Sequence, residues 1–326
     1  MGMWLRWVSG IAGAVLWGAA LTPATAQTYP NRPLRLVVPF GAGTATDLVA
    51  RHVGLGLASE LGQPVAVENR PGGGGMIGAE AVARSAPDGY TILMGTSASQ
   101  ATSVSLFKKV PFDPMADFAP IARISIFPAV LVVHQSIPAS TVAELIAYAK
   151  ARPGQLNYAT SGPGSQNHLQ AAMLAVTAGL QVTHVPFKDA SQIFGAIGRG
   201  EVAFMFYPYS ALGPVIQGGK VNVLASTGEK RSQLTPNTPT MIEAGYPELS
   251  LAGWNALYAP AGTPADIIDR LNIATGRALE NAEMRAKLGA LGVDLAFGSP
   301  RDLAAFTRAE IERYRKLVAL AQLKPE

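Results

Sequence analysis

The feature that most constrains the fold is an alternation of strand-like and helix-like segments along most of the 326-residue chain. Residues 34–40 form an apolar run rich in strand-forming side chains, and residues 46–61 then repeat apolar side chains at helical spacing. Short strands are also predicted at 64–69 and 90–95, with a helix at about 76–85 between them. Such alternation is typical of parallel sheets, so the sequence predicts an α/β fold.

A second α/β unit is predicted after residue 130. Thr141 and Glu144 form a capping-box pattern that opens a helix, and Pro153 and Gly154 end it. The strands predicted in this unit, each followed by a helix candidate, are residues 130–134, 156–160, 183–187, 202–207 and 221–226.

The C-terminal part of the chain is predicted to return to the first unit. Residues 249–260 read as the strand that carries the chain back. Two helices are predicted after it, with Thr263 and Ser299 as N-caps and Pro264 and Pro300 at the first helical position. This order predicts two lobes joined by two crossing strands: residues 27–127 plus 251–326 in lobe 1 and residues 128–250 in lobe 2. Ligands of such folds bind at strand carboxyl ends and between domains.

The N-terminus has the pattern of a secretory signal peptide. Arg6 precedes an apolar run at 7–21, and Ala24-Thr25-Ala26 is a small-x-small cleavage pattern. The run is shorter than the roughly 20 residues that a membrane span needs. We therefore predict a signal peptide at 1–26, cleaved near Ala26, and a mature periplasmic protein that the absence of cysteine leaves without a lipid anchor.

Composition argues against several classes of protein. Lys and Arg number 26 against 22 acidic residues, and they are scattered singly, unlike the basic stripe of a nucleic-acid-binding protein. The four histidines have no metal-ligand spacing. Residues 72–75 are a glycine run without the Gly-Lys-Ser/Thr of a phosphate-binding loop. The glycines within residues 54–59 lie inside a helical stretch rather than in a loop after a strand, which argues against a dinucleotide-binding motif. We therefore expect no metal, no nucleotide cofactor and no nucleic-acid partner.

Three predicted strand-to-helix loops are rich in Gly, Ser and Thr, at residues 40–47, 95–99 and 160–168. Each would present backbone N–H groups and hydroxyls at a helix N-terminus, where the first-turn amides have no internal acceptor and the helix dipole favours negative charge. A carboxylate suits this geometry without Arg or Lys.

Structural roles for the same residues stay open. Glycine-rich turns occur in many α/β folds for steric reasons. Thr46, Asp47 or Ser165 could be helix caps. His168 could be structural, and Lys188 could be a solvated surface charge.

Motifs along the mature chain resemble the Bug family, the periplasmic binding proteins associated with tripartite tricarboxylate transporters. The segments that carry this resemblance are residues 29–40 with Asp47 and Arg51, 67–72 with Gly78, 86–90 with Gly95 and Thr96, 161–165 with His168 and Leu169, 184–188, 239–240 with 243–245, and 259–264. The resemblance implies a two-lobed Venus-flytrap fold, of the type II-like architecture of periplasmic binding proteins. It also implies that backbone amides hold a carboxylate ligand and that permease subunits in the membrane are the partners. We expect the protein to be a monomer.

The chain departs from the family pattern in three places. Gly41-Ala42-Gly43-Thr44 stands where the family usually has Pro-Pro-Gly-Gly, and Asp189 where it often has Gly. Residues 202–207 lack two acids of the common pattern and end in Tyr207. This end of the site is therefore more aromatic, which favours an aromatic or apolar-tailed carboxylate, unless Tyr207 merely fills the interface between the lobes.

The ligand-binding residues predicted from the loops and the resemblance are Phe40, Gly41, Ala42, Gly43, Thr44, Thr46, Asp47, Thr96, Ser97, Ala98, Ser161, Gly162, Gly164, Ser165, His168, Phe187, Lys188 and Tyr207.

Two other classes of function stay open. One is a secreted esterase acting through Ser97 or Ser165, although residues 95–99 miss the last glycine of the nucleophile-elbow pattern. The other is a binding protein that presents its ligand to a signalling system, which shares the pocket and differs only in its partner.

Overall fold

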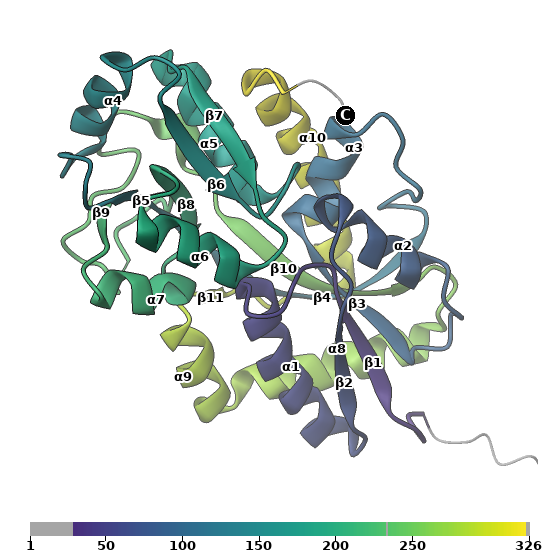
Figure 1. Ribbon diagram of the computed structural model, residues 1–326. Coiled ribbons are helices and arrows are strands. Elements are labelled where there is room, and N and C mark those ends of the chain that lie inside the picture. The colour runs from purple at the N-terminus through teal and green to yellow at the C-terminus, as the bar shows by residue number, and fades with distance from the viewer. Residues whose placement is uncertain (1–28, 233, 324–326) are drawn as a thin grey trace, which may run out of the picture.

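The computed structural model describes residues 29–232 and 234–323, so the predicted signal peptide at 1–26 lies outside the described residues. The strands form two sheets in two lobes (Figure 1). The first sheet, in the order β11-β4-β10-β3-β1-β2, contains β1 (Leu34–Val38), β2 (Val65–Asn69), β3 (Thr91–Thr96), β4 (Phe118–Phe127), β10 (Gly253–Pro260) and β11 (Asp294–Leu295). The second, in the order β7-β6-β8-β5-β9, contains β5 (Ala129–His134), β6 (Leu156–Thr160), β7 (Val182–Pro186), β8 (Phe204–Pro208) and β9 (Val221–Ser226).

Helices cover both sheets. We call the first sheet with its helices lobe 1 and the second sheet with its helices lobe 2. Lobe 1 has α1 (Ala45–Leu61), α2 (Met76–Ala83), a π-helical turn η2 (Ala98–Thr102) that continues into α3 (Ser103–Leu106), α8 (Ala265–Glu280), α9 (Ala282–Ala290) and α10 (Pro300–Leu320). Lobe 2 has α4 (Val142–Lys150), α5 (Gln166–Ala178), α6 (Ala190–Arg199) and α7 (Tyr209–Gln217).

Both sheets follow the same pattern, in which a parallel core receives one antiparallel strand. β1 pairs in parallel with β2 and β3, and β6 pairs in parallel with β7 and β8. β10 then lies antiparallel between β3 and β4, and β5 lies antiparallel between β8 and β9. The predicted α/β architecture with two crossing strands is confirmed. The sheets are mixed because β5 enters lobe 2 from lobe 1 and β10 enters lobe 1 from lobe 2, so each runs against the parallel strands of the lobe that it enters.

The chain passes between the sheets twice. Pro128 alone separates β4 from β5, and residues 227–252 return the chain from β9 to β10. The exact lobe boundaries at residues 127 and 251 stay a prediction. Within the described residues, only these two segments join the sheets. We call the boundary between the two lobes the seam, and several loops project onto it.

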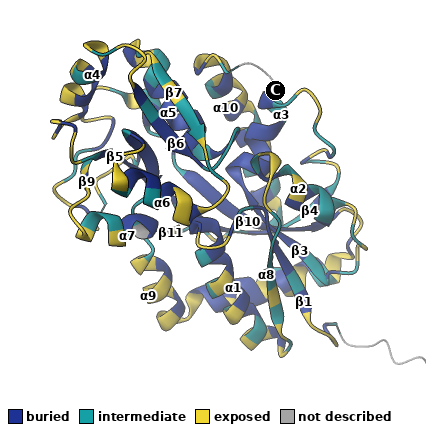
Figure 2. Ribbon diagram, viewed as in Figure 1, coloured by how far each residue is buried: buried dark blue, intermediate teal, exposed yellow. Residues whose placement is uncertain are grey.

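The central strands of both sheets are buried (Figure 2). Leu34, Leu36 and Val38 of β1 face the core that α1, α8 and α9 cover, and Val37 faces the opposite core. Strands buried on both faces read as continuous apolar runs, which is why the sequence signal of β1 is strong.

Helix starts were predicted with mixed success. Ser299 caps α10 in a complete capping box with Asp302, as its sequence indicates. Thr141 accepts the Glu144 amide, but the Glu144 carboxylate bonds to Ser140, so only half of the predicted box forms. The prediction that Thr263 caps α8 is wrong, because its hydroxyl donates to Pro260 O and Pro264 takes the N-cap position.

Gly253 supports the seam between the lobes. It opens β10 directly opposite Phe127, the last residue of β4, and a β-carbon added to Gly253 would lie 2.4 Å from the Phe127 ring. A side chain at this position would therefore displace a ring at the first crossing point.

We predict that Gly253→Ala lowers the free energy of unfolding by about 1–3 kcal/mol, the usual cost of overpacking a buried site. Urea unfolding of the two proteins measures the difference. Gly198→Ala is the matched control, because Gly198 lies in α6 with nothing within 4 Å of an added β-carbon. Alanine there should be neutral or stabilising, and equal effects at both positions would contradict the assignment.

Candidate functional site

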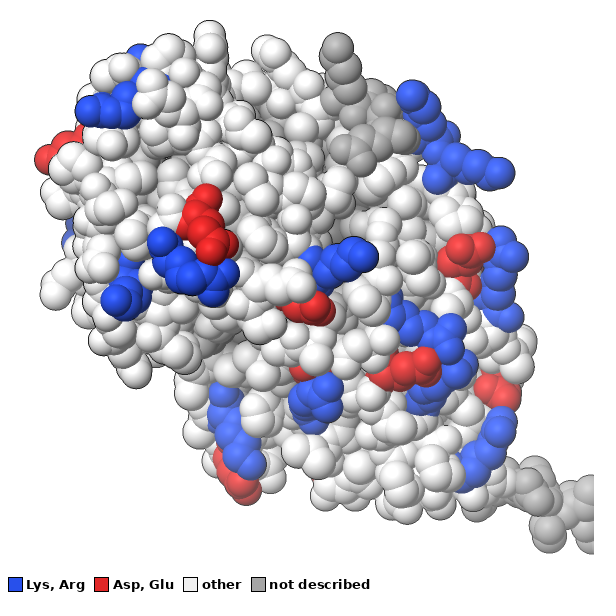
Figure 3. Space-filling view, viewed as in Figure 1, with Lys and Arg blue, Asp and Glu red and all other residues white. Residues whose placement is uncertain are grey.

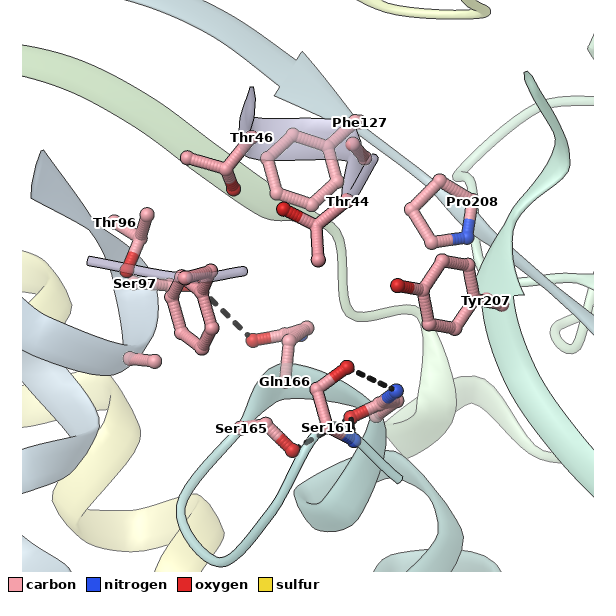
Figure 4. A pocket seen from close by; sticks show the side chains of 14 residues that line it. Thr44, Thr46, Thr96, Ser97, Phe127, Ser161, Ser165, Gln166, Tyr207 and Pro208 are labelled. Carbon is pink, nitrogen blue, oxygen red and sulfur yellow. Dashed lines mark hydrogen bonds between the residues drawn. The ribbon is translucent and has the colours of Figure 1, made fainter. Parts of the chain in front are cut away.

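A pocket lies between the lobes, and its lining comes from both of them (Figure 4). Including its opening to solvent, the space measures about 470 Å³. Its lining residues are Phe40, Thr44, Ala45, Thr46, Thr96, Ser97, Ala98, Phe127, Ser161, Ser165, Gln166, Asn167, Tyr207 and Pro208. None of them carries a formal charge.

The N-terminus of α1 supplies the first wall. Gly43 adopts a left-handed φ of 76°, which turns the chain so that Thr44 can cap the helix. The Thr44 hydroxyl donates to Gly41 O at 2.8 Å and accepts from the Asp47 amide at 3.4 Å. The amides of Ala45 and Thr46 then have no hydrogen-bond partner within residues 29–232 and 234–323, as expected of a first helical turn.

Asp47 fixes this loop from below. Its buried carboxylate accepts from Gly43 N at 2.9 Å, Arg51 Nε at 3.0 Å and Asn69 Nδ2 at 2.8 Å. Burial alone would raise the pKa of Asp47, but these hydrogen bonds outweigh it and hold the pKa below its ordinary value. Asp47 therefore stays ionised and lies beneath the pocket rather than on its wall.

The turn between β3 and η2 supplies a second helix N-terminus. Thr96 N donates to Ser99 Oγ at 3.1 Å, and Ser99 N donates back to Thr96 Oγ1 at 3.2 Å. This reciprocal pair closes the turn and leaves the amides of Ser97 and Ala98 without a partner in the described part of the chain.

The N-terminus of α5 supplies the third wall, from lobe 2. Ser165 Oγ lies 2.6 Å from both Gly162 O and Asn167 Oδ1, and Asn167 Oδ1 also accepts from Ser161 N at 3.2 Å. The Asn167 side chain therefore holds the loop closed. The amides of Gln166 and Asn167 have no partner among the described residues.

Three helix N-termini thus face one uncharged volume. Each brings unpaired amides and the positive end of a helix dipole, which together form an anion site. The side chains of Phe127, Tyr207 and Pro208 also line the pocket, with Phe127 beside Thr44 and with Tyr207 and Pro208 on the side away from Thr96 and Ser97 (Figure 4). Burial raises the pKa of Tyr207 to about 12, so its hydroxyl stays protonated.

Half of the predicted site residues line this pocket, namely Phe40, Thr44, Thr46, Thr96, Ser97, Ala98, Ser161, Ser165 and Tyr207. The other half lie outside the lining, namely Gly41, Ala42, Gly43, Asp47, Gly162, Gly164, His168, Phe187 and Lys188. The predicted site residues did not include Ala45, Phe127, Gln166, Asn167 and Pro208, which also line the pocket. Gln166 and Asn167 lie inside a loop that the sequence did single out, whereas nothing local marks Phe127.

Several of the residues outside the lining shape the loops that form it. A β-carbon at Gly41 would lie 3.2 Å from both Lys188 O and Asp189 Oδ1, so the two lobes approach closely there. Gly162 and Gly164 have left-handed φ angles of 102° and 73°, which the tight turn before α5 requires.

His168 lies beneath the α5 loop in an aromatic stack. Its Nδ1 accepts from Gly164 N at 3.2 Å, and its ring stacks on His184 with 4.1 Å between centroids. His184 Nε2 lies 2.6 Å from Thr160 Oγ1. Burial, with a smaller contribution from His184, lowers the pKa of His168 to about 4. His168 is thus a neutral acceptor that supports the loop.

Charges on the surface are mixed in sign. On the face that Figure 3 shows, basic and acidic side chains lie close together without a continuous basic patch. Ion pairs such as Arg70 with Glu68 and Arg84 with Glu80 account for part of this pattern. Within residues 29–232 and 234–323, no helix is long and apolar enough to cross a membrane, and no group of three His, Cys, Asp or Glu could hold a metal.

Two α/β lobes around a pocket lined by helix N-termini define the class of two-lobed periplasmic binding proteins. Residues 49–323 match the tripartite tricarboxylate transporter family receptor. The chain is 35% identical over 297 residues to Protein BugT of Bordetella pertussis, which covers 91% of both chains. The chain therefore belongs to the tripartite tricarboxylate transporter receptor family, which includes the Bug proteins, as its motifs indicate.

Solved structures agree with this assignment. R. palustris Rpa4515 with adipate superimposes with a TM-score of 0.88 at 34% identity, covering 91% of this chain and all of that one. MatC from Rhodopseudomonas palustris with bound malate gives 0.84 at 33% identity, covering 89% of this chain and all of that one. The predicted Venus-flytrap fold is confirmed.

We predict that stability falls as the pH drops from about 6.5 to about 4. His168 is neutral in the folded protein and has a pKa of about 4 there, while the unfolded chain binds a proton near pH 6.5. As the pH falls, the unfolded state therefore binds a proton before the folded state does. The difference between the two pKa values of His168 corresponds to a loss of roughly 3 kcal/mol in the free energy of unfolding once the pH is below both. Urea unfolding at a series of pH values measures it.

His168→Asn is the matched control, because its amide oxygen can accept from Gly164 N near the position of Nδ1 without titrating. The variant should lose less stability than the wild type across this pH range. Parallel curves for the two proteins would show that His168 is not the titrating group.

Proposed function

We propose that this protein captures a small carboxylate between its two lobes and delivers it to the permease of a tripartite tricarboxylate-type transporter. The observation that carries the proposal is the convergence of three helix N-termini, with unpaired amides, on one uncharged pocket. Two related structures support it, since one was solved with adipate and the other with bound malate.

The bound carboxylate is proposed to lie between Thr46 and Ala98 of lobe 1 and Asn167 of lobe 2. Amides from both lobes would donate to it, so that neither lobe alone completes the site. Closure would then bury the anion among charge-assisted hydrogen bonds, which are stronger than neutral ones. Capture in this way needs no covalent step.

The rest of the ligand is proposed to be apolar or aromatic. Phe127, Tyr207 and Pro208 present rings to the pocket, and no charged side chain is among the described lining residues. A second carboxylate beside these rings would meet one polar side-chain group among them, the Tyr207 hydroxyl. Burying an ion with so few partners is costly.

The proposed location is the periplasm, with release from the membrane after cleavage near Ala26. Membership of a transporter receptor family supports both this location and the permease partner. We expect the protein to act as a monomer.

The geometry favours binding over ester hydrolysis. Ser97 Oγ donates to Gln166 Oε1 at 3.1 Å, and Ser165 Oγ bonds within its own loop. Neither hydroxyl has a histidine partner in the described part of the chain, whereas a serine nucleophile requires a general base within hydrogen-bond reach.

We predict that the mature protein binds hexanoate or benzoate at least tenfold more tightly than adipate. Isothermal titration calorimetry with ligand-free protein measures the affinities, and a rise in melting temperature with ligand concentration provides an independent check. Tyr207→Phe is the matched variant: it should leave hexanoate binding nearly unchanged. Tighter binding of adipate, lost in Tyr207→Phe, would show that the space beside these rings accepts a second carboxylate.

We also predict no hydrolysis of p-nitrophenyl acetate beyond the rate of a Ser97→Ala/Ser165→Ala double variant. Release of p-nitrophenol, followed by absorbance, measures this. A rate that falls in the double variant while the fold is intact would support the esterase alternative.

A further inference from the structure

Gln166 connects the two lobes inside the pocket. It is the first residue of α5, and its side-chain oxygen accepts from Ser97 Oγ at 3.1 Å and from Tyr314 Oη at 2.8 Å (Figure 4 shows the first bond). Both donors belong to lobe 1, and both are buried. An amide oxygen has two lone pairs, so this group is fully used by the opposite lobe.

The donors are held firmly on lobe 1. Tyr314 lies on α10, and one turn earlier Glu310 accepts from Trp254 Nε1 of β10 at 2.8 Å. Burial raises the pKa of Tyr314 well above its ordinary value, so the hydroxyl keeps its proton and can donate. Ser97 is fixed by the closed turn between β3 and η2.

The same face of α5 also holds the return segment. Gln170 lies one helical turn after Gln166 and donates from Nε2 to Leu251 O at 2.7 Å. Residues four apart share a helix face. The two glutamines therefore place one face of α5 against lobe 1 and against the segment that joins the lobes.

The lobes also approach each other through backbone and through apolar side chains, since one buried cluster contains Leu169 of α5 and Val318 of α10. A β-carbon at Gly41 would lie 3.2 Å from Lys188 O, and one at Gly74 would lie 2.9 Å from Pro163 O. Within residues 29–232 and 234–323, the two bonds to Gln166 are the hydrogen bonds that join a side chain of lobe 1 to a side chain of lobe 2.

We propose that Gln166 is a latch that holds the lobes closed in the absence of ligand. In this proposal, the N-terminus of α5 moves away from lobe 1 when the pocket opens, which breaks both bonds, and the ligand enters the open form. Gln166 is thus a positioning residue that sets the ratio of closed to open protein. The consequence for ligand affinity rests on the proposed capture between lobes, but the closed state itself does not.

The test measures lobe separation without ligand. Because the chain has no cysteine, spin labels at Glu60→Cys and Gln155→Cys, exposed positions on lobes 1 and 2, report one distance by pulsed electron resonance. Gln166→Met keeps the side-chain length but removes the acceptor. The ratio of open to closed protein should rise about tenfold, as expected for two lost hydrogen bonds.

Gln217→Met is the matched control, since Gln217 is exposed at the end of α7 in the same lobe. It should leave the distance distribution unchanged. An identical distribution for Gln166→Met and Gln217→Met would overturn the latch.

Variants of the two donors provide a second test. Ser97→Ala and Tyr314→Phe should each open the protein less than Gln166→Met does. In the Gln166→Met background, Tyr314→Phe should add little, because the bond to Gln166 is already absent and only the 3.5 Å bond to Ala252 O remains. A full additional shift there would refute the shared acceptor, and circular dichroism establishes that each variant is folded.

The latch and the proposed function fail in different ways. A shift of the distance in ligand-free Gln166→Met without binding of any tested carboxylate refutes the function and keeps the latch. Carboxylate binding by a wild type whose distances match those of Gln166→Met refutes the latch and keeps the function.

Discussion

The amides of a first helical turn have no acceptor within their helix, and this constraint organises the region between the lobes. α1, η2 and α5 all begin at the seam, so their unpaired N–H groups point at one volume. The polar side chains of the loops do not neutralise these amides. Thr44, Ser99 and Asn167 instead bond to the turns that precede or follow them and hold each helix end in place.

The two crossing strands explain why this arrangement arises from one chain. β10 enters lobe 1 antiparallel to its neighbours, and β5 does the same in lobe 2, so the parallel strands of both sheets end toward the seam. The loops that follow β1, β3 and β6 therefore meet, although they are far apart in sequence. The contact between Gly253 and Phe127 then sets how closely the start of β10 packs against the end of β4.

Sequence reasoning identified most of this framework, because doubly buried strands and amphipathic helices leave local signals. It located the three loops but not which atoms in them face the pocket. Asp47 and His168 stand in the motifs yet support loops from beneath, since their partners lie within the same lobe. β4 and Phe127 were missed because the position of β4 depends on its pairing with β10, which no local pattern encodes.

The lack of charge in the pocket makes closure important. A site with Arg or Lys would attract an anion even when half formed, but helix dipoles act over a short range and are screened by water. Amides from one lobe alone therefore give a weak site, and the second lobe must supply both further donors and exclusion of solvent. A side chain such as Gln166, which joins the lobes by hydrogen bonds to Ser97 and Tyr314, then controls how much of the protein has the complete site.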